Sequence, residues 1–136
     1  MLLSEHHVVL QLEQSLFVHG GVLPEHVAYG LDNINEETRA WMRGEAPFPS
    51  ILNNQDAPTW SRHYSNDTDE ADCALLSQVL EQTGAKRIVV AHTVQDGINS
   101  VCGDRAWRVD VGMAEHYGGS TQVLEIANGL ARAISP

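Results

Sequence analysis

The chain has 136 residues, of which 43% are hydrophobic, and a formal net charge of −10. This length suits one domain or part of one, and the hydrophobic fraction is enough for a globular core. The excess of acidic residues argues against nucleic acid or an anionic membrane as a partner, because both repel an acidic surface. No apolar run is long enough for a transmembrane helix, and the N-terminal stretch lacks the features of a secretory signal. We therefore expect a cytoplasmic protein.

The sequence contains two cysteines, Cys73 and Cys102, which are far apart and form no CxxC motif. Reduced thiols are the expected state of such a pair in a cytoplasmic chain, and one structural disulfide is the alternative.

The first part of the chain predicts two strands followed by a helix. Residues 7–13 and 15–20 are apolar runs with a tight break between them, which is typical of neighbouring strands. Residues 33–43 predict a helix with acidic residues in its first turn, and Asn33 or Asn35 is the expected cap.

The second part begins with a loop at residues 44–58, which are rich in proline, glycine and asparagine. A helix is predicted at 69–84, with acidic residues at its start, an apolar face and Gly84 as its end. Strands are predicted at 86–91, 106–111 and 121–126 from short apolar or alternating runs. The fold class is therefore α/β with a core built mainly from strands.

Two of the seven histidines follow apolar strands directly. His19 ends the run SLFV, and His92 ends the run RIVVA. Ligands gather at the carboxyl ends of strands in open α/β folds, and neutral imidazole is the commonest side-chain ligand for first-row metals. His19 and His92 could therefore share one metal, and the alternative is that they are ordinary structural or solvated histidines. The other histidines are expected to be solvated or hydrogen-bonded, with His63 of interest because it adjoins Arg62: His6, His7, His26, His63 and His116.

The motif FVHGG places Gly20 and Gly21 directly after His19. A core histidine does not need two glycines after it, whereas a backbone that turns sharply beside a ligand does. We therefore expect a sharp turn at this point.

Arg62 and Asp110 are the charged residues whose positions suggest a role. Arg62 lies in TWSR, just after the proline-rich loop, and its planar guanidinium suits phosphate oxygens, although a plain surface arginine is the alternative. Asp110 lies in the apolar run RVDVG, where it either orients a histidine or caps a turn. The three tryptophans are expected to be packing residues: Trp41, Trp60 and Trp107.

The motifs FVHGG, WSR, VVAHT, WRVDVGM and EHYGG occur in this order along the chain. Together they resemble the calcineurin-like metallophosphoesterases, and most closely the PPP-type serine/threonine phosphatases of the bacterial and Shewanella-like branch. The resemblance runs over about residues 7–126. It implies the C-terminal half of a four-layer α-β-β-α sandwich.

The resemblance also implies a site and a reaction. His19 and His92 would be ligands of the second of two divalent metals, which are manganese or alternatively iron or zinc. Arg62 would contact the substrate phosphate, and Tyr117 resembles an active-site tyrosine. The implied reaction is hydrolysis of a phosphate monoester by metal-activated water without a covalent intermediate. The implied substrate is a phosphorylated protein, phosphorylated on serine or threonine, or a small phosphate ester.

The family motifs GDxHG, GDxxDRG and GNHE do not occur in the chain. In the family they supply the bridging aspartate and the other metal ligands, so residues 1–136 are expected to form a partial domain that is inactive by itself. Uncovered strands and open sheet edges would then favour self-association. The alternative is a degenerate half-domain that acts as a structural or binding module. An α/β-hydrolase would need a GxSxG nucleophile elbow, and the sequence has none.

Overall fold

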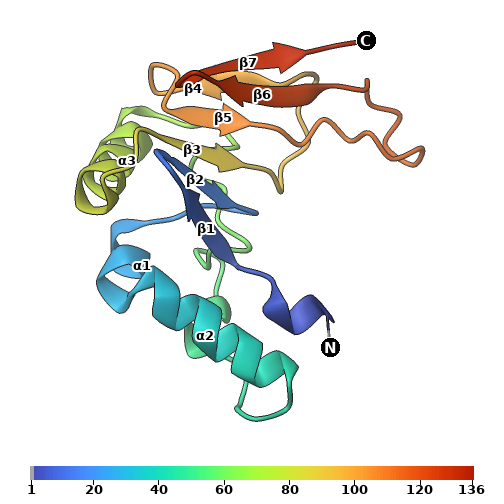
Figure 1. The fold of residues 1–136 in the computed structure, drawn as a ribbon. Coiled ribbons are helices and arrows are strands. Elements are labelled where there is room, and N and C mark those ends of the chain that lie inside the picture. Colours follow the sequence, from blue (N-terminus) through green and yellow to red (C-terminus); the bar gives the residue numbers. More distant parts are fainter. Residues whose placement is uncertain (1) are drawn as a thin grey trace.

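The computed structural model describes residues 2–136 and shows a mixed α/β fold (Figure 1). The helices are α1 (Pro24–Tyr29), α2 (Leu31–Met42) and α3 (Glu70–Thr83), with short 3₁₀ turns at Leu2–Glu5 and Ser50–Leu52. The strands are β1 (Val9–Leu12), β2 (Ser15–Val18), β3 (Arg87–Val90), β4 (Asn99–Val101), β5 (Ala106–Arg108), β6 (Val123–Ala127) and β7 (Leu130–Ile134). One sheet has the order β1–β2–β3–β5–β4, and β6 pairs with β7 in a separate hairpin.

The centre of the five-stranded sheet is parallel. β2 pairs with β3 and β3 with β5 in parallel, whereas β1 and β4 are antiparallel edge strands. Leu16, Ile88 and Ala106 are direct neighbours across the three central strands, and all three are fully buried. The apolar face of α3 belongs to the same core through Leu76, Val79 and Leu80. Because β2 and β3 run in the same direction, the residues that follow them, His19 and His92, meet at one edge of the sheet.

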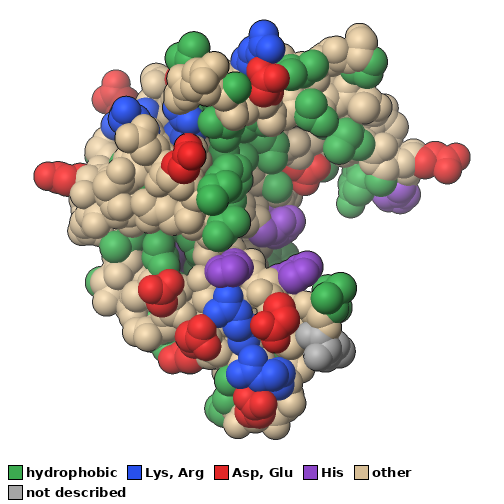
Figure 2. Space-filling view, in the orientation of Figure 1, with side chains coloured by type: hydrophobic (Ala, Val, Ile, Leu, Met, Phe, Trp, Pro, Cys, Tyr) green, Lys and Arg blue, Asp and Glu red, His purple; other side chains and the backbone are tan. Residues whose placement is uncertain are grey.

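The opposite face of the sheet is only partly covered. It carries Leu10 and Phe17, which are cross-strand neighbours, and Leu12, whose exposed fraction is 60%. The turn of the β6–β7 hairpin contacts this face, since Arg87 donates a hydrogen bond to the carbonyl of Gly129. Figure 2 shows hydrophobic side chains over the strands beside a deep notch, which lies between the hairpin end of the molecule and the end that holds α2. The expectation of uncovered strand surface is therefore met.

The predicted helix at 69–84 is confirmed, and both of its ends have a local cause. Asp69 accepts a hydrogen bond from the backbone N–H of Asp72, whose carboxylate in turn accepts from the N–H of Asp69. This reciprocal capping box satisfies two backbone donors at the start of α3. Gly84 ends the helix in the left-handed conformation, with φ of +70°, which glycine adopts without steric cost.

The cap predicted for α2 is wrong. The helix begins at Leu31 after Gly30, and no side chain caps it. Asn35 lies inside the helix instead and reaches the edge strand β1. Its Oδ1 accepts from the N–H groups of Val8 and Val9, at 2.8 and 3.1 Å, and its Nδ2 donates to the carbonyl of Val9 at 2.8 Å. This side chain therefore completes part of an open sheet edge.

The expectation of reduced thiols is also wrong. Cys73 and Cys102 form a disulfide that joins the first turn of α3 to the turn between β4 and β5. The two residues are 29 positions apart in the sequence, and the packing of α3 on the sheet brings them together. Among the described residues, no helix is long and apolar enough to cross a membrane.

Candidate functional site

His19 and His92 come together at the edge of the sheet. The distance between Nε2 of His19 and Nδ1 of His92 is 3.0 Å, and the ring centroids are 4.9 Å apart. The backbone holds the two strand ends in place, since the N–H of Ala91 donates to the carbonyl of His19 at 2.9 Å. Figure 2 shows histidine side chains along the inner wall of the notch. The pairing inferred from the two strand ends is thus present in the structure.

The spacing of these two nitrogens fits one metal ion. In the structure the two nitrogens are at hydrogen-bond distance, and two metal–nitrogen bonds of about 2.1 Å at the roughly 90° angle of octahedral coordination would place them about 3 Å apart as well. Within residues 2–136, however, no group of three or more histidine, cysteine, aspartate or glutamate side chains is arranged to hold a metal. The pair therefore offers two candidate ligands, and a complete metal site would need further ligands such as carboxylate oxygens.

The surroundings of His92 favour its neutral imidazole. Burial lowers the pKa of His92, and the nearby charges of Arg62 and His19 lower it further, while Asp110 acts in the opposite direction. Neutral imidazole is the form that binds metals. His92 also has a φ of +65°, which is unusual for a residue with a side chain, and the ring of Trp60 packs against it at 5.1 Å. Backbone strain of this kind concentrates at functional sites.

Arg62 lies next to the loop that carries His92. Its Nη1 donates to the hydroxyl of Thr93 at 3.2 Å, and that hydroxyl also bonds to the hydroxyl of Ser65 at 2.8 Å. The amide Nε2 of Gln95 donates to the carbonyls of both Ser65 and Thr93, at 2.9 and 3.0 Å. Two loops from distant parts of the chain are thus clamped together. As a result, the guanidinium of Arg62 lies near His92, and its other donors bond to no residue between 2 and 136.

The two glycines after His19 have a different cause from the one expected. Neither Gly20 nor Gly21 is among the residues with positive φ, so no left-handed turn requires them. Instead, both N–H groups donate to the carbonyl of Pro58, at 2.8 and 3.0 Å. A Cβ atom on Gly20 would lie 2.8 Å from the Pro58 carbonyl oxygen and 2.8 Å from the N–H nitrogen of Ser61. The glycines therefore admit the backbone of the loop that presents Trp60 and Arg62.

Tyr117 is not brought to this site. Its side chain is exposed, at 65%, and its ring packs against His116 with centroids 5.0 Å apart. In the described part of the chain, no hydrogen bond or ring contact links it to His19, His92 or Arg62.

Of the two roles left open for Asp110, the structure shows the turn cap. Its Oδ1 accepts a hydrogen bond from the N–H of Gly112 at 3.1 Å. It also acts on His92 through its charge alone.

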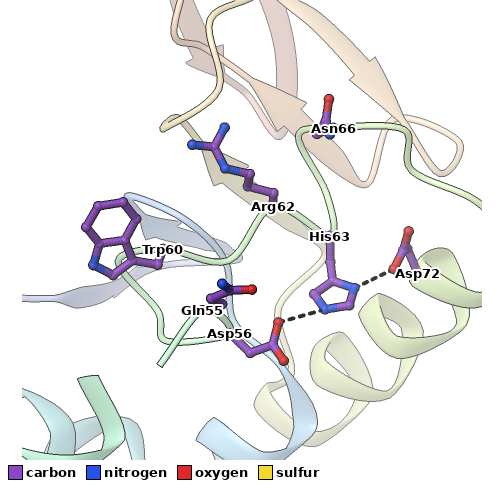
Figure 3. Close-up of a pocket in the computed structure, with 7 residues that line it drawn as sticks. All are labelled: Gln55, Asp56, Trp60, Arg62, His63, Asn66 and Asp72. Carbon is purple, nitrogen blue, oxygen red and sulfur yellow. Dashed lines mark hydrogen bonds and ion pairs between the residues drawn. The ribbon is translucent and has the colours of Figure 1, made fainter. Parts of the chain in front are cut away.

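His63 was expected to be solvated or hydrogen-bonded, and it lies between two carboxylates. Its Nδ1 contacts Oδ1 of Asp72 at 2.6 Å, and its Nε2 contacts Oδ1 of Asp56 at 3.2 Å (Figure 3). Burial lowers the pKa of His63, but hydrogen bonds to Asp72 and Asp56 and their charges outweigh this effect, so the pKa is raised. Its position next to Arg62 was a signal in the sequence, whereas its two carboxylate partners were not.

His63, its two carboxylate partners and Arg62 of the candidate site share a hollow of about 520 Å³. Its lining residues are Gln55, Asp56, Trp60, Arg62, His63, Asn66 and Asp72 (Figure 3). Trp60 was expected to be a packing residue, but its exposed fraction is 58%. Trp60, which contacts His92, and Arg62, which contacts Thr93, thus also line the hollow.

Comparison with known proteins identifies similar phosphatases. The chain is 41% identical over 131 residues to Shewanella-like protein phosphatase 2 of Arabidopsis thaliana. This match covers 91% of this chain and 34% of that protein. The chain is 27% identical over 116 residues to Shewanella-like protein phosphatase 1 of Plasmodium berghei (strain Anka), with coverage of 78% and 32%. No family model matches the chain. The chain therefore spans about a third of the length of the curated relatives it matches.

Solved structures support the same fold. A cold-active protein tyrosine phosphatase superposes with a TM-score of 0.78 at 22% identity, over 96% of this chain and 43% of that chain. Another structure of a cold-active protein tyrosine phosphatase, from a psychrophilic Shewanella species, gives a TM-score of 0.79 at 23% identity, over 96% and 41%. At this level of identity the likeness establishes the fold, and the α/β class predicted from the sequence is confirmed.

Proposed function

We propose that this chain is part of a Shewanella-like protein phosphatase and contributes to the hydrolysis of phosphate monoesters. Its contribution would be two metal ligands, His19 and His92, and a phosphate contact, Arg62. The observation that carries the proposal is the 3.0 Å approach of Nε2 of His19 to Nδ1 of His92. The names of the relatives, both protein phosphatases, support the phosphatase part of the proposal.

Each residue has a definable task in this reaction. When bound, two divalent ions, manganese or alternatively iron or zinc, would lower the pKa of a water molecule and polarise the phosphate. His19 and His92 would offer neutral nitrogens to one ion from rigid strand ends. Arg62 would neutralise charge on the phosphate, with Thr93 holding one end of its guanidinium in place. Tyr117 is included on the resemblance alone.

For the substrate, we propose a protein phosphorylated on serine or threonine, with small phosphate esters as further substrates. A phosphotyrosine substrate is the direct competitor, since the similar solved structures are named tyrosine phosphatases. Parallel assays with peptides that carry phosphoserine, phosphothreonine or phosphotyrosine would separate these substrate classes.

A second function is supported by the incomplete ligand set. Two imidazoles without carboxylate partners do not make a two-metal centre, and residues 2–136 offer no larger group of such ligands. The chain by itself would then be a structural or binding module. The two functions differ in whether the histidine pair completes a working site when the rest of a phosphatase domain is supplied.

The first test is metal binding by the isolated chain. Zinc would be titrated into ¹⁵N-labelled protein, with the ring nitrogens of the histidines followed by NMR. We expect His19→Ala and His92→Ala each to weaken binding by at least about tenfold, because each removes one of two ligands. His116→Ala is the matched control, since His116 is exposed and packs against Tyr117. Equal affinity in all four proteins would refute the shared site.

The second test is manganese-dependent hydrolysis of an aryl phosphate. The chain would be assayed alone and mixed with the segment of the Arabidopsis relative that lies outside the matched region. We expect activity in the mixture that disappears with either histidine variant. Activity of the chain alone that needs both histidines would mean that copies of the chain assemble the site together. Inactivity in both cases, with the segments bound to each other, would favour the module.

A further inference from the structure

We propose that the hollow beside Arg62 binds a basic side chain of the substrate, next to the phosphorylated residue. This inference rests on the proposed function, because it takes Arg62 as the contact for phosphate. It adds a recognition element for which no role has been assigned, built from Trp60 and Asp56.

The hollow borders directly on the candidate reaction site. The rings of Trp60 and His92 pack nearly perpendicular to each other, at 85°, and Trp60 also lines the hollow. Arg62 likewise lines the hollow while its Nη1 holds Thr93, the residue after His92. A substrate whose phosphate lies on Arg62 therefore places its neighbouring side chains at the mouth of this hollow.

The two ends of the hollow differ in charge. Figure 3 shows the guanidinium of Arg62 pointing away from the Asp56 carboxylate, with the indole of Trp60 to one side between them. A bound phosphate would neutralise Arg62. The remaining charged walls are Asp56, Asp72 and His63, which sum to −1 when His63 is protonated and to −2 when it is neutral. An occupied site would thus leave a hollow that attracts a cation.

Asp56 and Trp60 are both available to a ligand. The Asp56 side chain is 58% exposed, and it contacts His63 through Oδ1 only. Its Oδ2 forms no hydrogen bond with any residue between 2 and 136. The exposed indole of Trp60 offers a face for a cation–π contact, which favours arginine over other side chains. A carboxylate and an indole that line the same hollow are a chemically matched pair for a guanidinium.

His63 and Asp72 hold this arrangement in place. Asp72 is the less exposed of the two carboxylates, at 16%, and its hydrogen bond fixes the imidazole from α3. The imidazole in turn holds Asp56, which belongs to the separate loop before Trp60. The two partners of His63 lie on different segments, Asp72 on α3 and Asp56 on the loop before Trp60. The tertiary fold therefore fixes the walls of the hollow.

The test compares phosphoserine pentapeptides that carry either arginine or alanine on both sides of the phosphoserine. Binding to the ¹⁵N-labelled chain would be followed at the indole N–H of Trp60 and at the backbone amides of Asp56 and His63. We expect the arginine peptide to bind about tenfold more tightly, with shifts at all three residues. Asp56→Asn should remove this advantage. Glu81→Gln should keep it, because it removes the same charge from an exposed position on α3.

Unphosphorylated versions of both peptides separate this inference from the proposed function. If the phosphate does not increase the affinity but the arginine peptide still shifts the NMR signal of Trp60, the phosphate role of Arg62 fails and the basic subsite stands. Equal binding of the arginine and alanine peptides would overturn the subsite. So would an arginine advantage that survives Asp56→Asn, because the attraction would then come from the overall negative charge of the chain.

Discussion

Single residues at the candidate site are held by contacts from several segments. His92 is fixed by its strand end and by the clamp that Gln95 forms between Thr93 and Ser65. Arg62 is fixed through Thr93 on one side and through its neighbour His63 on the other. The charge state of His63 affects its contacts with Asp72 and Asp56, so its titration should change the stability of the folded chain.

We predict that His63 makes the stability of the chain depend on pH. Its pKa is raised in the folded chain above the ordinary value of about 6.5, because its bonds to Asp72 and Asp56 outweigh the effect of burial. A raised pKa means that the stabilisation is fully present below about pH 6.5 and is lost as the pH rises through the folded-state pKa. The free energy of unfolding of the wild type, minus that of His63→Gln, should therefore shrink as the pH rises above about 6.5.

Urea denaturation at several pH values would measure this difference. Asp72→Asn is the matched variant, since it removes the nearer carboxylate and should flatten the same pH dependence. His26 has a lowered pKa because it is buried, so its contribution changes with pH in the opposite direction. That contribution is present in both proteins and cancels in the difference. A difference that stays constant or grows with pH would contradict the prediction.

At the scale of elements, the contact between α2 and the edge strand β1 depends on the amide of Asn35. It forms three hydrogen bonds to the backbone of Val8 and Val9, and its exposed fraction is only 4%. We predict that Asn35→Ala lowers the free energy of unfolding by about 2 to 4 kcal/mol, because it leaves buried backbone groups without partners.

The matched control for Asn35 is Asn33→Ala on the same helix. Asn33 is exposed and donates one hydrogen bond, to the carbonyl of Tyr29. Its loss should cost less than about 1 kcal/mol. Urea denaturation of the three proteins would compare them, and similar values for both variants would show that Asn35 has no special role at the sheet edge.

Elements with strong local signals were predictable from the sequence. The apolar runs before His19 and His92 predicted β2 and β3, and the acidic start and Gly84 predicted α3. The elements that were missed have weak signals. β4 has three residues, Asn99–Val101, α1 has six, and arginine interrupts the apolar pattern of β7.

The parts of the candidate site also differ in how well the sequence predicts them. The positions of His19 and His92 followed from two parallel strands, which is a local pattern plus one topological rule. The carboxylates around His63, and the disulfide between Cys73 and Cys102, join segments that only the tertiary fold brings together. The reason for Gly20 likewise lies in a distant loop. Such contacts between segments leave no periodic signal in the sequence.

At the scale of the whole molecule, an open apolar surface is combined with a strong net charge. The uncovered face of the sheet carries Leu12, and Leu130 at the hairpin is exposed at 74%. Exposed apolar strands favour association, whereas a net charge of −10 on each copy opposes it. Salt screens the repulsion and leaves the hydrophobic attraction in place. The balance between these two effects should therefore be visible in the oligomeric state.

We predict that the isolated chain self-associates through this face, and that association increases with salt. Sedimentation at tens of micromolar should give an average mass above the 14.9 kDa of one chain, and a higher mass at high than at low ionic strength. Leu12→Lys should shift the protein toward the monomer, because it places a charge on the open sheet face. Met113→Lys is the control, since Met113 is exposed at 55% but lies in neither sheet. A monomer at all salt concentrations would contradict the prediction, and equal effects of the two variants would place the contact elsewhere.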